Sequence, residues 1–176
     1  MIMTVGHSTR PIDEFINLLK DHGIKRLVDV RKVPRSRHNP QFNDDELPNS
    51  LRSAHIGYTH MPALGGLRHA RKDSVNTGWR NLSFRGFADY MQTPEFEQGL
   101  QQLIELDARE PIAIMCAEAV PWRCHRSLIA DALTARGIPV EDIVGPARAQ
   151  PHKMTPFAQV DGFRVTYPAE QGTLNL

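Results

Sequence analysis

The chain has few of the features that mark secreted or membrane proteins. It contains only two cysteines, Cys116 and Cys124, whereas secreted domains held by disulfides carry more of them, spread more widely. The first residues lack the basic segment and the apolar run of a signal peptide. No segment approaches the ~18 consecutive apolar residues that a membrane helix needs. We therefore expect a cytoplasmic protein with no membrane partner.

A strong excess of charge of either sign is also missing. The 176 residues include 21 Lys and Arg against 20 Asp and Glu, for a net charge of +1. No global field therefore steers the protein towards nucleic acids or membranes, and any attraction for anions must come from local clusters. The length suits one domain that can bury a core without disulfides or metals.

Strand and helix patterns alternate along the chain and predict an α/β fold. A strand at 3–6, a helix starting at Pro11 and closed by Gly23, and a strand at 27–30 form a βαβ unit. Further helices are predicted over 44 or 48–54, 84–91, 93–104 and 124–136, and further strands over 58–61, 111–115 and 140–144. The sequence thus predicts a single open, mainly parallel twisted sheet with helices on both faces.

The composition changes at Gly145. Residues 145–176 are proline-rich and contain an Asp161-Gly162 turn followed by a strand-like segment at 163–167. We expect an α/β domain over 1–144 and a C-terminal extension over 145–176. The extension is expected to pack on the same domain and can supply one edge strand.

Polar residues follow three of the predicted strands. The first strand ends at His7 and Ser8, the second at Asp29 and Arg31, and the apolar strand at Cys116. In open parallel sheets, ligands bind beyond the carboxyl ends of the strands. If the three strands are neighbours, these residues share one crevice, which is the main argument for a functional site.

The segment 116–126 runs from that apolar strand through a loop into a helix. The first amides of a helix are unpaired and its dipole favours negative charge, so an anion or a thiolate is stabilised there. Cys124 lies at this helix start, and basic neighbours lower the pKa expected for its thiol. These neighbours are Arg123, His125 and Arg126. Glu118 acts in the opposite direction, because a nearby carboxylate disfavours a thiolate.

Four kinds of chemistry fit this segment. One is a cysteine nucleophile of the phosphatase or rhodanese kind, although Trp122 occupies the position where phosphatases have arginine and the loop has no glycine. Another is metal binding, without the spacing of a strong metal motif. A third is a reversible disulfide, which requires the two Cα atoms within about 7 Å. In the fourth, Cys116 is a small buried side chain and the charged residues bind a ligand or each other. The metal ligands would come from His7, Cys116, Glu118, Cys124 and His125.

Other motifs leave similar alternatives open. Asp29 and Arg31 alternate along a strand, so both point to one face, either as an ion pair or with the carboxylate orienting Arg31 or His125. Ser8 binds a ligand or caps the following helix. Basic runs at 31–38 and 68–72 form a rim for phosphates or a nucleic-acid backbone, or a solvated loop face.

These motifs resemble the domain-of-unknown-function 488 family, over about residues 4–144. The shared segments, in order, are Val5-Gly6-His7-Ser8, Val28-Asp29-Val30-Arg31, Pro34-Arg35-Ser36-Arg37, Phe42, Gly57-Tyr58, Leu64-Gly65-Gly66, Met115-Cys116-Ala117-Glu118 and Cys124-His125-Arg126. Segments of the tail at 151–153, 157–158 and 167–168 resemble a subgroup of the family. The resemblance implies an α/β fold and marks these positions as shared features, but it implies no reaction.

We expect an enzyme that acts on an anionic ligand, phosphate-bearing or nucleotide-like, at the carboxyl edge of the sheet. The expected catalytic residues are Cys116, Glu118, Cys124 and His125, with His125 as the acid–base group because its pKa lies nearest neutrality. The expected ligand-binding residues are His7, Ser8, Asp29, Arg31, Arg35, Ser36, Arg37, Gly65, Gly66 and Arg126. The sequence identifies no cofactor and leaves the oligomeric state open. The alternatives are a non-catalytic nucleic-acid-binding protein and a thiol or metal sensor that uses Cys116 and Cys124.

Overall fold

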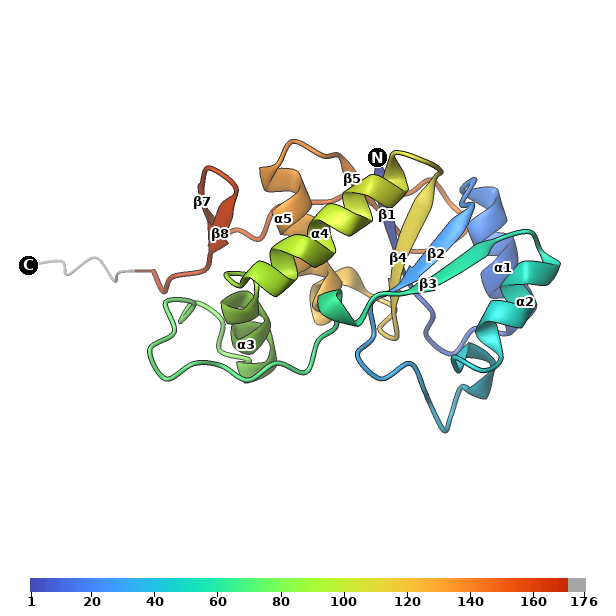
Figure 1. Ribbon diagram of the computed structural model, residues 1–176, viewed down its shortest axis with the longest axis horizontal. Helices are drawn as coiled ribbons and strands as arrows, with labels where there is room; N and C mark the ends of the chain where they lie inside the picture. Colours follow the sequence, from blue (N-terminus) through green and yellow to red (C-terminus); the bar gives the residue numbers. More distant parts are fainter. Residues whose placement is uncertain (171–176) are drawn as a thin grey trace, which may run out of the picture.

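The computed structural model describes residues 1–170 and shows a six-stranded sheet between two layers of helices (Figure 1). The strand order is β3-β2-β4-β1-β5-β6, and all pairs are parallel except β5 with β6. The strands are β1 (Ile2–Gly6), β2 (Arg26–Asp29), β3 (Gly57–His60), β4 (Ile112–Cys116), β5 (Val140–Ile143) and β6 (Gln150–Pro151). The helices are α1 (Ile12–Asp21), α2 (Leu47–Ser53), α3 (Leu82–Tyr90), α4 (Pro94–Asp107) and α5 (Arg126–Ala135). The predicted open, mainly parallel α/β sheet is confirmed.

Alternate residues of each strand face two separate cores, because successive side chains of a strand point to opposite sides. In β4, Ile112 and Ile114 pack in the core with α3, α4 and α5, whereas Ala113 and Met115 pack with α1 and α2. Figure 1 shows these two groups of helices on opposite sides of the sheet. All residues of β4 are buried, which explains why this strand is continuously apolar.

The sheet reverses its winding between the neighbouring strands β1 and β4. The helix after β1 is α1, which covers one face, and the helix after β4 is α5, which covers the other. Such a switch point leaves a crevice beyond the strand ends in open parallel sheets. His7 follows β1 and Cys116 ends β4, so both residues lie at this crevice.

The helix after β4 begins two residues later than the sequence predicts. Residues Pro121–Arg123 form a short 3-10 helix, and Cys124 is extended, with φ −132° and ψ 145°. Cys124 therefore belongs to the loop immediately before α5 and not to the helix.

The C-terminal extension contacts the α/β domain through two pieces of strand. The short β6 pairs with β5 at the sheet edge, while β7 (Gln159–Asp161) and β8 (Arg164–Thr166) form a separate hairpin. The predicted strand at 163–167 is thus present as β8, but it pairs with β7 and not with the main sheet. The fully buried Tyr167 follows β8, and its hydroxyl donates to Asp131 of α5 at 2.7 Å. The end of the predicted extension, residues 171–176, lies outside the described residues.

Candidate functional site

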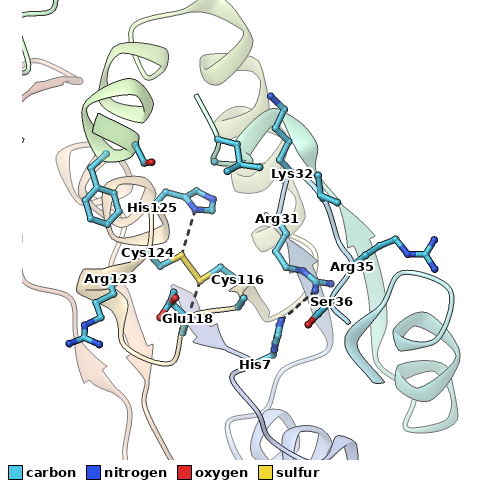
Figure 2. A pocket seen from close by; sticks show the side chains of 16 residues that line it. His7, Arg31, Lys32, Arg35, Ser36, Cys116, Glu118, Arg123, Cys124 and His125 are labelled. Carbon is cyan, nitrogen blue, oxygen red and sulfur yellow. Dashed lines mark hydrogen bonds between the residues drawn. A yellow bond between two sulfur atoms is a disulfide. The ribbon is translucent and has the colours of Figure 1, made fainter. Parts of the chain in front are cut away.

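A cavity of about 390 Å³ opens beyond the carboxyl ends of β1, β2 and β4 (Figure 2). The structure thus brings the polar ends of the three strands together, as the sequence predicts. The lining contains polar, charged and apolar side chains from four loops and the first turn of α3. The residues are His7, Arg31, Lys32, Val33, Arg35, Ser36, Gly66, Leu67, Ser83, Phe84, Cys116, Ala117, Glu118, Arg123, Cys124 and His125.

A disulfide joins Cys116 to Cys124 in the wall of this cavity (Figure 2). It connects the last residue of β4 to the loop just before α5, and the two Cα atoms lie 7.2 Å apart. Both side chains are almost completely buried. The structure therefore contains the third of the four chemistries that fit the sequence, the disulfide, and Cys116 is also a small buried side chain, as the fourth expects.

Arg126, in the first turn of α5, points its guanidinium at this disulfide. The side chain is fully buried, and Nη1 lies 2.8 Å from Sγ of Cys116. Its other hydrogen bonds go to the carbonyls of Glu118 and Ala119 and to the hydroxyl of Thr4. Burial lowers the pKa of Arg126 to about 10, so the group is a cation at neutral pH. Within the described chain, no carboxylate is in hydrogen-bond contact with this buried cation.

The imidazole of His125 is held in one tautomer. Its Nε2 lies 2.9 Å from the carbonyl oxygen of Val30 and 3.1 Å from that of Leu64. Carbonyl oxygens only accept hydrogen bonds, so Nε2 carries the proton and Nδ1 is the acceptor. Nδ1 lies 3.6 Å from Sγ of Cys124. Burial lowers the pKa of His125 to about 4, and the neutral ring therefore presents a lone pair towards this sulfur.

The opposite wall is built by Arg31 and His7. Asp29 accepts from Nε and Nη2 of Arg31 at 2.9 and 2.7 Å, and from the hydroxyl of Tyr58 at 2.6 Å. Nη1 of Arg31 lies 3.4 Å from Nε2 of His7, whose Nδ1 donates to the carbonyl of Ser8 at 2.7 Å. Burial lowers the pKa of His7 to about 4. Asp29 and Arg31 thus face the same side, as predicted, and form a buried ion pair.

Exposed basic side chains surround the mouth of the cavity. Arg35 pairs with Asp45 at 3.2 Å, whereas Lys32 and Arg123 have no ion-pair partner among residues 1–170. Glu118 supplies the acidic side chain of the lining. The rim therefore carries a local excess of positive charge that the net charge of the chain does not reveal.

Five of the residues predicted to bind a ligand lie outside the lining. Asp29 and Arg126 lie behind the wall and contact Arg31 and Cys116 instead. Gly65 packs on Lys32, because a Cβ on this glycine would lie 2.9 Å from the Cα of Lys32. The other two are Ser8, which has a positive φ of 51°, and the exposed Arg37.

The second basic run, 68–72, does not line the cavity, and of its basic side chains Arg68 packs on α3 whereas His69, Arg71 and Lys72 are exposed. The guanidinium of Arg68 lies 3.7 Å from the ring centre of Tyr90 and donates to two loop carbonyls. Arg71 pairs with Asp73 at 3.0 Å. This run therefore does not extend the cationic rim.

Seven lining residues are outside the predicted set, and they are Lys32, Val33, Leu67, Ser83, Phe84, Ala117 and Arg123. Lys32 and Arg123 belong to basic clusters that the sequence displays, so that signal could have identified them. Ser83 and Phe84 lie in the first turn of α3, which no motif marks. Their position depends on how α3 is placed over the sheet.

No group of three or more His, Cys, Asp or Glu side chains in residues 1–170 is arranged to hold a metal ion. Over the same residues, no helix has the length and apolar character needed to cross a membrane. The groups that the cavity offers to a ligand are sulfur, imidazole, guanidinium, ammonium, hydroxyl and carboxylate groups.

One protein family matches the chain by its sequence profile. The family is described as domain of unknown function DUF488, and the match covers residues 11–133. This range contains both cysteines and the strands β2, β3 and β4. No curated protein and no solved structure matches the chain.

Proposed function

This chain belongs to the domain of unknown function DUF488 family, and we propose that it is a cytoplasmic enzyme that binds an anionic ligand in the cavity and acts on it with Cys116 and Cys124. The ligand class includes phosphate-bearing and nucleotide-like molecules. The proposal is supported by a cationic rim, two cysteines and a histidine that all face one cavity at the switch point of the sheet.

The contact between Arg126 and Cys116 carries the proposal. Arg126 is fully buried, and its Nη1 lies 2.8 Å from Sγ of Cys116. Burial lowers the pKa of Arg126, and the charges of Asp142 and Glu118 act from a distance to raise it. Neither carboxylate contacts Arg126 directly, and burying a cation without a counter-charge in contact is costly. Once the disulfide is reduced, a thiolate at Cys116 supplies that charge, so its pKa falls well below that of an ordinary thiol. A stabilised thiolate is the reactive form of cysteine.

Cys124 has separate means of activation. It lies directly before α5, and the backbone N–H of Arg126 is directed at its sulfur at 3.5 Å. The partial positive charge of a helix N-terminus favours a thiolate at this position. The unprotonated Nδ1 of His125 accepts a hydrogen bond from the thiol when the cysteine is reduced. His125 is thus the acid–base group of the proposal.

The rim supplies attraction for the ligand. Lys32 and Arg123 place positive charge at the mouth, and clefts lined by one sign of charge concentrate ligands of the opposite sign. Arg31 contributes a further cation, which Asp29 holds in place. Glu118 lies in the same lining and disfavours ligand charge close to its own carboxylate.

The pH dependence of alkylation at each cysteine tests this proposal, with fully reduced, chelator-treated protein and mass spectrometry to resolve the two sites. We expect Cys116 to react with an apparent pKa well below ~8.5. Arg126→Lys should keep this pKa low and Arg126→Gln should raise it. Arg109→Gln, at an exposed position, is the matched control. Ordinary pKa values at both cysteines of the folded wild-type protein would contradict the proposal, whether or not the Arg126 variants fold.

A thiol sensor is a second candidate, because the structure contains the disulfide that such a sensor requires. A sensor differs from an enzyme in that its two forms persist and no ligand is turned over. Limited proteolysis of the loop 117–125 in oxidised and reduced protein tests this candidate. Identical cleavage in both forms would count against it. No comparable observation favours the nucleic-acid alternative, since the second basic run does not line the cavity.

A further inference from the structure

The two cysteines of the cavity have different surroundings. The sulfur of Cys116 contacts the guanidinium of Arg126. The sulfur of Cys124 instead faces Nδ1 of His125 (Figure 2). In thiol–disulfide exchange, the sulfur with the lower pKa leaves faster. A cation in direct contact stabilises the departing thiolate, so Cys116 is the better leaving group. This asymmetry assigns a distinct role to each cysteine.

We propose that the site exchanges its disulfide with small thiols that carry negative charge, with Cys124 forming the mixed disulfide and Cys116 resolving it. This inference rests on the proposed function, because it names the chemical class of the anionic ligand. Carboxylate-bearing and phosphate-bearing thiols share this chemistry.

The reaction needs no reactant besides the thiol ligand. The ligand thiolate attacks Sγ of Cys124, the protein S–S bond breaks, and its electron pair leaves with Sγ of Cys116 as a thiolate beside Arg126. A second ligand thiolate attacks the ligand sulfur of the mixed disulfide and releases the ligand disulfide and the thiolate of Cys124. Cys124 takes up one proton and the second ligand proton passes to solvent. Two ligand thiols are oxidised and one protein disulfide is reduced.

In the opposite direction, Cys124 again forms the mixed disulfide and Cys116 resolves it. Reduced Cys124 attacks a ligand disulfide and expels one ligand thiolate. The thiolate of Cys116 then attacks Sγ of Cys124 in the mixed disulfide, expels the second ligand thiolate and restores the protein disulfide. The direction depends on the reduction potentials of the protein and ligand couples and on the concentrations of the ligand thiol and disulfide.

Charge around the disulfide favours an anionic partner. Figure 2 shows Arg123 on one side of the disulfide and Lys32 and Arg35 on the other. A thiol whose sulfur reaches Cys124 therefore brings its remaining groups among these cations, which outnumber Glu118, the acidic side chain of the lining. Disulfides in reducing compartments are mostly transient and catalytic or redox-sensing, so an exchangeable disulfide agrees with the proposed cytoplasmic location.

The charge preference is measured with two chromogenic disulfides on reduced protein. One is the anionic 5,5′-dithiobis(2-nitrobenzoate) and the other is the neutral 4,4′-dithiodipyridine, each rate being divided by that of a free cysteine peptide. We expect a roughly tenfold preference for the anionic probe at low salt, which declines as salt is added. The double variant Lys32→Glu/Arg123→Glu should abolish this preference.

The matched control is Lys25→Glu/Arg109→Glu. Both positions are exposed and lie just before β2 and β4, at the opposite end of the strands from the cavity. The control makes the same change in net charge and should keep the preference. A preference lost equally in both double variants, or absent from the wild type, would overturn the assignment of the ligand class.

The cysteine roles are tested by stoichiometry with the anionic probe. Reduced wild-type protein should release two equivalents of coloured thiolate and retain no label. Cys116→Ser should release one equivalent and retain the label on Cys124, identified by mass spectrometry. In Cys124→Ser, labelling of Cys116 should be slower. The reverse order of reactivity, or label retained on both wild-type cysteines, would overturn the assigned roles.

These results separate the two proposals. Equal normalised rates for the two probes, together with a low pKa at Cys116, would remove the thiol ligand class and leave the proposed function in place. Ordinary pKa values at both cysteines would remove the proposed function itself.

Discussion

At the scale of single residues, Asp29 holds the guanidinium of Arg31 in place and does not itself line the cavity. It accepts from the backbone N–H and two side-chain nitrogens of Arg31 and from the hydroxyl of Tyr58, and its own side chain is fully buried. Nη2 of Arg31 is bound further by the carbonyl of Phe42 at 2.7 Å. Only Nη1 remains to face His7. Asp29 therefore acts as a positioning residue for Arg31.

Removal of the Asp29 carboxylate should destabilise the folded protein. We predict that Asp29→Asn lowers the free energy of unfolding by about 3–5 kcal/mol, because it leaves Arg31 as a buried cation without a counter-charge. Tyr58→Phe removes one hydrogen bond to the same carboxylate and should cost only about 1 kcal/mol. Urea unfolding of the two variants and the wild type measures both values. Equal losses in the two variants would contradict the assigned role.

The sequence predicts part of this arrangement. The two-residue period of a strand places Asp29 and Arg31 on one face, and the structure confirms it. The third partner, Tyr58, was not predictable because it lies on β3. It reaches Asp29 only through the register that pairs Leu27 with Tyr58 across β2 and β3. Such a register depends on how strands pair and is not encoded by local spacing.

At the scale of elements, the loop after β4 is fitted closely over the end of β1. The backbone N–H groups of His7 and Ser8 donate to the carbonyls of Cys116 and Ala117, both at 2.9 Å. A Cβ on Gly6 would lie 1.6 Å from the backbone oxygen of Glu118. Only glycine leaves room for this crossing, which brings the end of β1 beside the disulfide loop.

We predict that Gly6→Ala displaces the loop 117–125. The contact is with backbone that cannot move as a flexible side chain would, so the change should cost about 1–3 kcal/mol of unfolding free energy. The cysteine alkylation profile should change with it. Gly145→Ala is the matched control, since a Cβ there meets no atom within 4 Å and should change stability by under about 0.5 kcal/mol. Similar effects of the two variants would contradict this account of the loop.

The order of helices and strands follows from apolar spacing, and the structure confirms it. The placement of the edge strand does not follow from such spacing. Residues 163–167 have the composition of a strand, yet β8 pairs with β7, while the edge position belongs to Gln150–Pro151. That two-residue strand has no pattern of its own. It pairs because the chain passes β5 there, which is a tertiary effect.

At the scale of the whole molecule, buried histidines make stability depend on pH in two directions. His152 lies between Asp131, at 2.7 Å, and Asp142, at 3.6 Å. Burial alone would lower its pKa, but hydrogen bonds to the two aspartates outweigh this and raise it to about 9. Burial instead lowers the pKa values of His7 and His125 to about 4. The ordinary pKa of histidine, 6.5, lies between these lowered and raised values.

We predict that these histidines together give maximum stability near pH 6.5. Protonated His152 makes its full contribution to the free energy of unfolding below pH 6.5. This contribution is lost as pH rises through about 9, and the complete loss amounts to roughly 3 kcal/mol. Neutral His7 and His125 make their full contribution to the free energy of unfolding above pH 6.5, and this contribution is lost as pH falls through about 4.

Urea unfolding between pH 5 and pH 9 measures this profile. His152→Gln should remove the loss on the alkaline side and leave the acidic side unchanged. His69→Gln, at an exposed position, should alter neither side. An alkaline loss of the same size in His152→Gln as in the wild type would contradict the role of this histidine.

The burial of Tyr167 has a consequence for synthesis of the chain. Its ring packs against Trp79 and Phe157, and its hydroxyl is bound to Asp131. On the ribosome, every strand of the main sheet emerges before this residue, because the amino-terminal part is made first. Until then, Asp131 lacks one of its donors and the aromatic cluster is open to water. A nascent or prematurely terminated chain that stops short of Tyr167 thus presents a complete sheet with an unfinished layer, the kind of apolar surface that chaperones and quality-control proteases bind.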